Sequence, residues 1–313
     1  WANEGAPAVL DCLDMVNPPL SDDPLFGFAI TTVGGLLQKQ FKETVWLVPD
    51  LLPTPNLTIV AGPPKVGKSW YVGLLAITIA RSGYEVVYIA NEDTEKRLQS
   101  RFKSLDTCDG IHFISGLDSE KPLPKGAAAH DFIRALKKRY PNAACVIVDT
   151  LAAIRAAPPL RTKKDDYALA EEEFGALRKL AHELDLAIIA VHHTRKASDH
   201  DGSPVERLLG SQGIAATAET IMVMKQKGGS LNVDLHVTGK DVEQRDLIMR
   251  WKSPGFEWPE EMAEAELGSF QRKCLDLIRQ FPCCTQKYIE TELEADKSQV
   301  SKAVSRLVEK RLV

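Results

Sequence analysis

The chain contains the stretch Leu57-Thr58-Ile59-Val60-Ala61-Gly62-Pro63-Pro64-Lys65-Val66-Gly67-Lys68-Ser69-Trp70, which carries its strongest structural signal. An apolar run of strand type leads into a G-x-x-x-x-G-K-S loop, and this loop opens a helical pattern from Lys68 to Arg81. Glycines let backbone N–H groups wrap a triphosphate, the lysine reaches the β and γ phosphates, and the serine holds Mg²⁺. Residues 62–70 are therefore predicted to bind ATP and Mg²⁺. The alternative, a glycine-rich turn, is disfavoured by the flanking strand and helix.

Length and composition are those of a globular protein. The chain has 313 residues, of which 44% are hydrophobic and 26% are charged, so it can form one large domain and one small one. The net charge is −4, which does not favour general coating of nucleic acid. Contact with DNA would therefore need a local basic patch.

Cysteine spacing and hydropathy indicate the cellular compartment in which the protein is expected. The six cysteines show no C-x-x-C pair and no histidines at zinc spacing, so we predict neither a disulfide framework nor a zinc site. No apolar run reaches the roughly 18 residues of a membrane span, and no signal peptide opens the chain. We expect a cytoplasmic protein without membrane partners. Because the chain begins with Trp1, we expect its natural N-terminus to lie upstream. Whether a further domain precedes residue 1 is left open.

The chain reads as three regions. Residues 1–44 are expected to be an arm or linker with one short amphipathic segment, residues 33–41. Across residues 45–262, apolar runs alternate with helical patterns, which predicts an α/β domain with a mainly parallel sheet and right-handed crossovers. Residues 263–313 show three helical patterns and are expected to form a small winged-helix-like domain.

The expected elements of the large domain follow from hydrophobic periodicity. The buried strands are expected at Leu57–Ala61, Glu85–Ala90, Ile111–Ile114, Ala144–Val148 and Ala187–Val191. The helices between them are expected at Lys68–Arg81, Thr94–Ser104, Ala127–Tyr140 and Asp165–Leu184. Hairpin strands that extend the sheet are expected at Thr220–Met224, Leu231–Val237 and Asp246–Trp251.

A second nucleotide signal is an apolar run, residues 145–148, that ends in Asp149. A carboxylate at this place organises Mg²⁺ in ATPases with a phosphate loop. Together with Ser69, Asp149 is therefore predicted to hold the metal. A helix cap is the alternative for an aspartate at the end of a strand.

A third signal is the acidic end of the strand after the loop helix, Asn91-Glu92-Asp93. Hydrolysis needs a carboxylate near the attacking water, and Glu92 is expected at the same sheet edge as Lys68 and Asp149. We predict that Glu92 is the catalytic carboxylate. Asp93, which precedes Thr94, is predicted to cap the next helix.

A fourth signal is the pair His192-His193 at the end of another buried strand. A histidine there can sense the γ-phosphate and pass its presence into the following loop. The alternatives are a core histidine and a metal-binding pair. Adjacent strand residues point to opposite faces, which is a poor arrangement for holding one ion.

Together, these motifs resemble RecA-like ATPases of the hexameric RepA plasmid-helicase type. The resemblance covers residues 46–252 and rests on the order of a phosphate loop, strands ending in Glu92, Asp149 and His193, and terminal hairpins. It implies a RecA-like fold in which Glu92 activates water, Asp149 orders Mg²⁺ and its water, and His193 senses phosphate. Arg101 matches an arginine that the family keeps near the nucleotide, and a solvated helix face is the alternative.

Ring ATPases of this type hydrolyse at subunit boundaries with a cation from the neighbour. The resemblance therefore implies a homo-oligomer, expected to be a hexameric ring. In the matching region, residues 237–241, this chain has Lys240 where relatives often carry arginine. Lysine neutralises charge but lacks the bidentate fork. Lys225, Arg245 and Arg250 are rivals for this role, and Lys240 as an exposed turn residue is the other reading.

The segment 194–213 occupies the place where RecA-like proteins put a DNA-contacting pore loop. The residues predicted to contact single-stranded DNA are Arg195, Lys196, Arg207, Ser211 and Gln212. Cations and backbone amides on such a loop suit sequence-independent phosphate contact. Three acids in the same segment offset this charge, and the segment has no aromatic residue to stack on bases.

The last helical pattern, residues 297–312, is basic and amphipathic. As a recognition helix it would present Ser298, Gln299, Lys302 and Arg306 to duplex DNA. A domain that docks a subunit or a replication protein is the alternative.

Three functions compete. The leading one is an ATP-driven ring motor acting on single-stranded DNA in replication, a replicative helicase of phage or plasmid type. The second is an ATP-switched DNA-binding or helicase-loading protein without unwinding activity. A small-molecule kinase is the third, and the absence of a lid with paired arginines disfavours it.

Overall fold

The computed structural model describes residues 30–105, 108–155, 165–194, 217–226, 230–253, 255–265, 267–310 and 312–313. The chain divides into two compact units, Trp1–Glu43 and Thr44–Val313. In the described part of the first unit, α2 (Val33–Leu37) is capped by Thr32, whose side chain accepts a hydrogen bond from the Gly35 backbone at 3.1 Å. The apolar side chains of α2 are exposed.

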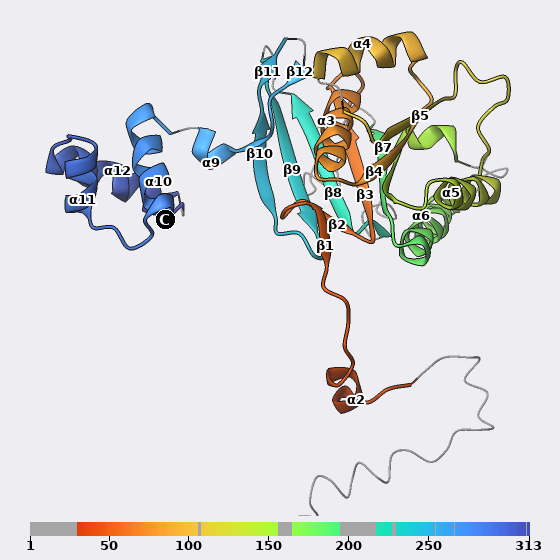
Figure 1. The fold of residues 1–313 in the computed structure, drawn as a ribbon, viewed down its shortest axis with the longest axis horizontal. Helices are drawn as coiled ribbons and strands as arrows, with labels where there is room; N and C mark the ends of the chain where they lie inside the picture. Colours follow the sequence, from red (N-terminus) through yellow and green to blue (C-terminus); the bar gives the residue numbers. More distant parts are fainter. Residues whose placement is uncertain are drawn as a thin grey trace, which may run out of the picture. The chain divides into compact units, whose positions relative to one another are not determined.

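The second unit is built on a nine-stranded sheet with the order β13-β10-β9-β8-β3-β7-β6-β4-β5 (Figure 1). The parallel strands are β3 (Asn56–Gly62), β4 (Glu85–Ala90), β5 (Ile111–Ser115), β6 (Ala143–Asp149), β7 (Ala187–His193) and β8 (Thr220–Gln226). The antiparallel extension consists of β9 (Val233–Gly239), β10 (Arg245–Met249) and β13 (Glu260–Glu261). This confirms the predicted mainly parallel sheet extended by hairpin strands.

Helices cover both faces of the sheet because its central strands are apolar on both faces. All residues of β3 are buried, and alternate residues enter different cores: Val60 lies in one, whereas Ile59 and Ala61 lie in the other. The first core includes α3 (Lys68–Arg81) and α4 (Glu95–Leu105), and the second includes α5 (Ala127–Arg139), η1 (Leu151–Ala153) and α6 (Asp165–Leu184). Strand, crossover helix and parallel strand thus alternate as predicted.

Two small ribbons flank this core. β1 (Val45–Val48) pairs with β2 (Leu52–Thr54), and β11 (Trp251–Lys252) pairs with β12 (Gly255–Phe256). The strand predicted at residues 246–251 is therefore corrected, because β10 ends at Met249 and Trp251 enters a separate ribbon. There the Trp251 ring packs edge-on against Trp70, with 5.8 Å between centroids, and against Phe256 at 5.0 Å. This aromatic packing stabilises Trp251 in the ribbon, outside the nine-stranded sheet.

The C-terminal residues form α9 (Met262–Ala265), α10 (Ser269–Gln280), α11 (Gln286–Glu292) and α12 (Lys297–Glu309). The last three helices share a core that includes Leu275, Ile289, Val300 and Leu307. Asp296 caps α12 by accepting a hydrogen bond from the Gln299 backbone at 3.0 Å. α10, α11 and α12 are the three helices expected within residues 263–313, and α12 ends at Glu309, before the end of the predicted pattern at residue 312. The wing stays a prediction.

Candidate functional site at the carboxyl edge of the sheet

Parallel strand direction brings the predicted site residues to one edge of the sheet. β3 ends at Gly62 and continues into the phosphate loop, β6 ends at Asp149, β7 ends at His193, and Glu92 follows the end of β4. These strands are consecutive in the order β3-β7-β6-β4. Residues separated by up to 131 positions in the sequence, from Gly62 to His193, are therefore collected along one edge.

The phosphate loop connects β3 to α3 without a regular element between them. Gly67 has a φ of 100°, a conformation that glycine adopts without steric cost, and a Cβ at this position would overlap the Phe256 ring. Pro64 and Lys65 are exposed at the tip of the loop. The loop therefore requires glycine at position 67, both for its φ and because the Phe256 ring of β12 occupies the place of a side chain.

Lys68, the first residue of α3, is 4% exposed. Its Nζ donates hydrogen bonds to the carbonyl oxygens of Gly62 and Pro63, both at 2.8 Å. Burial lowers the pKa of the Lys68 ammonium to about 8, although Asp149 and Glu92 favour its charged form. The ammonium thus lies inside the curve of the loop, where a phosphate would take over its hydrogen bonds.

Asp149 is buried, and a tyrosine hydroxyl from β4 contacts its carboxylate. The Tyr88 hydroxyl donates to Asp149 Oδ2 at 2.8 Å. Burial raises the pKa of the Asp149 carboxyl, against the lowering effect of the Ser69 and Tyr88 hydroxyls. Its Oδ1 is buried and has no hydrogen-bond partner among the described residues. Asp149 is thus held through Oδ2 by Tyr88, and its other carboxylate oxygen is available.

Glu92 follows β4, and its carboxylate contacts a residue that follows β6 and the last residue of β7. Its Oε1 accepts a hydrogen bond from the Thr150 hydroxyl at 3.0 Å, and His193 Nε2 lies 3.3 Å from both carboxylate oxygens. The Glu92 side chain is 53% exposed. A carboxylate held at this edge and open to solvent can accept a proton from a water molecule.

The two adjacent histidines have different surroundings, as the strand geometry predicts. His193 faces Glu92, and its Nδ1 is buried without a hydrogen-bond partner in the part of the chain described. Burial, with smaller contributions from Arg155 and other cations, lowers the pKa of His192 to about 4. No cluster of three or more His, Cys, Asp or Glu side chains suited to a metal ion occurs among the described residues.

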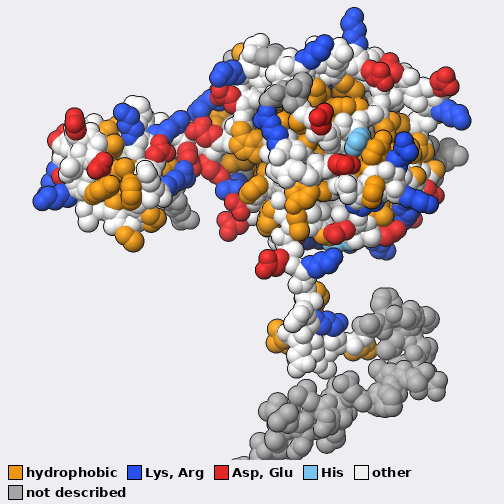
Figure 2. Space-filling model, in the orientation of Figure 1, with side chains coloured by type: hydrophobic (Ala, Val, Ile, Leu, Met, Phe, Trp, Pro, Cys, Tyr) orange, Lys and Arg blue, Asp and Glu red, His pale blue; other side chains and the backbone are white. Residues whose placement is uncertain are grey.

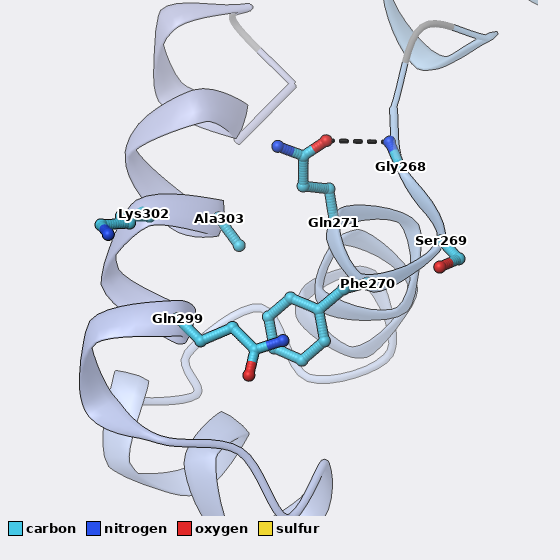
Figure 3. A pocket seen from close by; sticks show the side chains of 7 residues that line it. All are labelled: Gly268, Ser269, Phe270, Gln271, Gln299, Lys302 and Ala303. Atoms are coloured by element: carbon cyan, nitrogen blue, oxygen red, sulfur yellow. Dashed lines mark hydrogen bonds between the residues drawn. The ribbon is translucent and has the colours of Figure 1, made fainter.

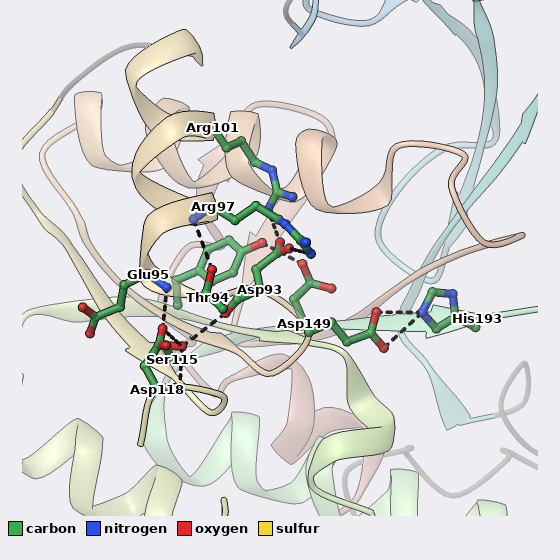
Figure 4. A network of polar contacts seen from close by, with 11 residues as sticks. Asp93, Thr94, Glu95, Arg97, Arg101, Ser115, Asp118, Asp149 and His193 are labelled. Atoms are coloured by element: carbon green, nitrogen blue, oxygen red, sulfur yellow. Dashed lines mark hydrogen bonds and ion pairs between the residues drawn. The ribbon is translucent and has the colours of Figure 1, made fainter. Parts of the chain in front are cut away.

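Arg101 is buried, which corrects the alternative of a solvated helix face. Its guanidinium lies 2.5 Å from Asp93 Oδ2 (Figure 4). The same guanidinium lies 5.5 Å from the centroid of the Trp70 ring. Asp93 also binds Arg97 at 3.1 Å. The carboxylate of Asp93 is thus directed to the arginines of α4, and Thr94 is the residue whose side chain accepts a bond from the Arg97 backbone. The predicted cap at Asp93 is wrong for this reason.

The lysines predicted as candidates for completing the nucleotide site of a neighbouring subunit lie at opposite edges of the sheet. Lys240 is exposed just after β9, which runs back along β8 to the edge away from the phosphate loop. Lys225 is exposed at the carboxyl end of β8, close to the loop edge. Arg245 and Arg250 are occupied in ion pairs with Glu261 at 2.8 Å and Glu260 at 2.5 Å.

The predicted nucleic-acid residues fall in two places. Arg195, Lys196, Arg207, Ser211 and Gln212 lie outside the described residues. Lys302 and Arg306 are exposed on α12.

Charged side chains of both signs are interspersed on the visible face of the C-terminal helices (Figure 2), and Arg306 pairs with Glu309 at 3.2 Å. A shallow groove of about 370 Å³ lies between the start of α10 and α12, with Phe270 and Gln299 in its lining (Figure 3).

Sequence reasoning missed three contributors to this site. Tyr88 reads as one more apolar strand residue, Thr150 as the residue after a motif, and Phe256 as a residue beyond the last predicted strand. The aromatic character of Tyr88, next to the acids that end β4, is the one local signal. The contacts of Thr150 and Phe256 join residues 58 and 189 positions apart, and no local pattern reports them.

Comparisons with known proteins identify a family and several similar chains. A family described as "AAA domain" (AAA_25) matches residues 23–199. The DNA repair and recombination protein RadB of Methanobrevibacter smithii is 22% identical over 175 residues, which cover 55% of this chain and 73% of RadB. A solved ATPase domain is 14% identical with a TM-score of 0.50, covering 64% of this chain and 84% of that domain. A DnaB-like replicative helicase is also 14% identical, with a TM-score of 0.49 and coverage of 64% and 56%.

None of the described helices is both long and apolar enough to cross a membrane. The family match spans more than half of the 313 residues and includes the phosphate loop, Glu92, Asp149 and His193. With its sheet order and its likeness to the solved ATPase domain, the chain belongs to the AAA_25 family of AAA domains and has the RecA-like ATPase fold.

Proposed function

We propose that the protein is an ATP-hydrolysing ring motor, expected to be a hexamer, that acts on single-stranded DNA in replication. The observation that carries this proposal is the position of the Glu92 carboxylate, held by Thr150 and His193 at the edge that also bears Lys68 and Asp149. A phosphate-binding loop alone serves many activities. A carboxylate beside it, open to water, favours hydrolysis over mere binding.

The residues present fit a magnesium–triphosphate ligand. Lys68 Nζ lies within the loop on two carbonyl oxygens, and Asp149 Oδ1 is buried without a partner among the described residues. Ser69 and Asp149 would hold Mg²⁺, and Lys68 with the loop backbone would hold the phosphates. When bound, Mg²⁺ supplies positive charge that offsets the charge developing on the phosphate oxygens.

Glu92 would orient a water molecule and accept its proton as that water attacks the γ-phosphate. His193 lies within 3.3 Å of the same carboxylate and precedes the segment predicted to contact DNA. A change at the phosphate would therefore reach that segment through the Glu92–His193 contact. The name of RadB, which assigns it to DNA repair and recombination, is consistent with a DNA substrate.

Glu92→Gln tests the chemistry. It is expected to retain nucleotide binding and to lower turnover by roughly 10²–10⁴-fold, the usual effect of removing a general base. Glu95→Gln, an exposed acid three residues away on α4, is the matched control and should retain wild-type turnover. Wild-type turnover in Glu92→Gln would overturn the proposed role.

The assembly is tested by measuring mass in solution with and without single-stranded DNA and a non-hydrolysable ATP analogue. A nucleotide-dependent ring whose turnover rises with DNA is expected. A stable monomer with DNA-independent turnover contradicts the proposal.

The trans-acting cation is tested by comparing Lys240→Ala with Lys225→Ala. Lys240→Ala is expected to lose turnover while it retains nucleotide binding and assembly, and Lys225→Ala should have the smaller effect. The reverse result would move the role to Lys225.

A second function is favoured by the C-terminal helices. α11 and α12 pack around a short turn, and α12 exposes Gln299, Lys302 and Arg306. This arrangement suits recognition of duplex DNA by an ATP-switched regulator, or docking on a replication protein. Sequence-selective duplex binding that persists in Glu92→Gln would favour the regulator over the motor.

A further inference from the structure

We infer that Thr150 is a positioning residue that holds the Glu92 carboxylate toward the phosphate-loop side of the sheet edge. This inference rests on the proposed role of Glu92 as the group that activates water. The role is assigned to Thr150 because of its hydrogen bond to Glu92 and because the residue is buried.

The sheet order creates a distance that Glu92 must span. In the order β3-β7-β6-β4, the strand that precedes Glu92 is three positions from the strand that leads into the phosphate loop. With neighbouring strands about 4.8 Å apart, the two strands are separated by roughly 14 Å. A glutamate side chain reaches only about 5 Å from its Cα at bond lengths of about 1.5 Å. To contribute to chemistry at the loop, Glu92 must therefore lean across β6 rather than extend into solvent.

Thr150 supplies a fixed contact in that direction. Its hydroxyl donates to Glu92 Oε1 at 3.0 Å, and the residue is 2% exposed. Its backbone is held between β6 and η1, where its carbonyl oxygen accepts from the Ala153 backbone at 3.0 Å. A β-branched side chain on such a backbone has little rotamer freedom. The loop that bears Glu92 is tied to the same place, because the Asn91 N–H donates to the Asp149 carbonyl at 2.7 Å.

His193 alone is a weaker support for the carboxylate. Its Nε2 lies 3.3 Å from the carboxylate oxygens, and it donates a hydrogen bond only in the tautomer that carries the proton on that nitrogen. The Thr150 hydroxyl always has a proton to donate. Since 53% of the Glu92 side chain is exposed, water can replace a lost hydrogen bond, so stability should change little when the hydroxyl is removed.

The test compares Thr150→Val, which retains shape and removes the hydroxyl, with Thr150→Ser, which retains the hydroxyl. We expect Thr150→Val to lower kcat for ATP by roughly 10- to 100-fold, the effect of losing a hydrogen bond to a charged group. KM for ATP, affinity for a fluorescent non-hydrolysable analogue and Tm should stay near the wild-type values. Thr150→Ser should recover kcat to within about threefold of wild type.

Glu92→Gln, measured in parallel, separates the two hypotheses. An inactive Glu92→Gln with wild-type kcat in Thr150→Val overturns this inference and leaves the proposed function standing. Wild-type turnover in Glu92→Gln overturns both. If Thr150→Val does not fold, Thr150→Ala replaces it, and equal kcat in the Ala and Ser variants overturns the inference.

Discussion

Replacing Tyr88 by phenylalanine removes one oxygen atom from the centre of the site. The Tyr88 ring is fully buried, and its hydroxyl donates to Asp149 Oδ2 at 2.8 Å. Burial and the neighbouring Asp149 carboxylate raise the pKa of Tyr88, so the phenol keeps its proton and remains the donor. In Tyr88→Phe, one oxygen of a carboxylate that is 4% exposed loses this donor.

The magnitude follows from burial and charge. A hydrogen bond to a charged group contributes roughly 1.5–3 kcal/mol, and a buried acceptor left without a donor does not regain that energy from water. We expect the free energy of unfolding of Tyr88→Phe to fall by about 2 kcal/mol at pH 7. The weaker hold on Asp149 should also raise the Mg²⁺ concentration needed for half-maximal binding of a nucleotide analogue.

Tyr71 provides the matched control. It is also fully buried, but its hydroxyl is directed at the Met222 sulfur at 3.5 Å, a weak acceptor. Tyr71→Phe should therefore change stability by less than about 0.5 kcal/mol. Urea unfolding of both variants, with m-values compared to confirm a common unfolded state, measures the difference. Equal destabilisation of the two variants would refute the reasoning that the Tyr88 hydroxyl stabilises an ionised Asp149.

Three further outcomes are expected. Gly67→Ala should abolish nucleotide binding in a fluorescence titration, because Gly67 has a φ of 100° and a Cβ there overlaps Phe256; Phe256→Ala should not restore binding, since the strained φ remains. Arg101→Met should cost about 2–4 kcal/mol in urea unfolding because it removes one partner of a buried ion pair, whereas Arg97→Met, at a position 66% exposed, should cost under about 1 kcal/mol. His192 has a folded-state pKa of about 4, below the unfolded value of about 6.5, so wild type should lose about 2 kcal/mol of stability between pH 7 and pH 5, a loss that His192→Gln should lack.

The parts of the site that the sequence predicted share one physical origin. Glu92, Asp149 and His193 each end a run of buried strand residues, and parallel strands connected by right-handed crossovers place their carboxyl ends at one edge. Local periodicity therefore locates these residues without knowledge of the sheet order. The bounds of α3 and α6 were predictable for a related reason, because uninterrupted helical periodicity separates two strand patterns there.

The parts that the sequence did not predict depend on contacts across the fold. An aspartate after a strand has the same sequence pattern whether it caps a helix or binds an arginine. Asp93 binds an arginine because Arg101, eight residues later, faces inward. A signal for this was present: Leu98 and Leu105 define the inward face of α4, and Arg101 lies between them at helical spacing. A cation on an apolar face indicates a buried partner, and that partner is Asp93.

Strand direction also limits which cation can complete the site. β8 runs parallel to β3, so Lys225 lies near the phosphate loop of its own chain, whereas β9 returns seven residues to the far edge, where Lys240 follows it. At about 3.3 Å per residue, that return places Lys240 roughly 20 Å from the loop edge. Lys240 therefore cannot reach the phosphates of its own subunit, and any catalytic contribution from it requires a neighbouring chain. Lys225 has no such restriction. A catalytic role for Lys240 would therefore indicate a mechanism that depends on assembly, whereas a role for Lys225 is compatible with a mechanism that a single chain completes.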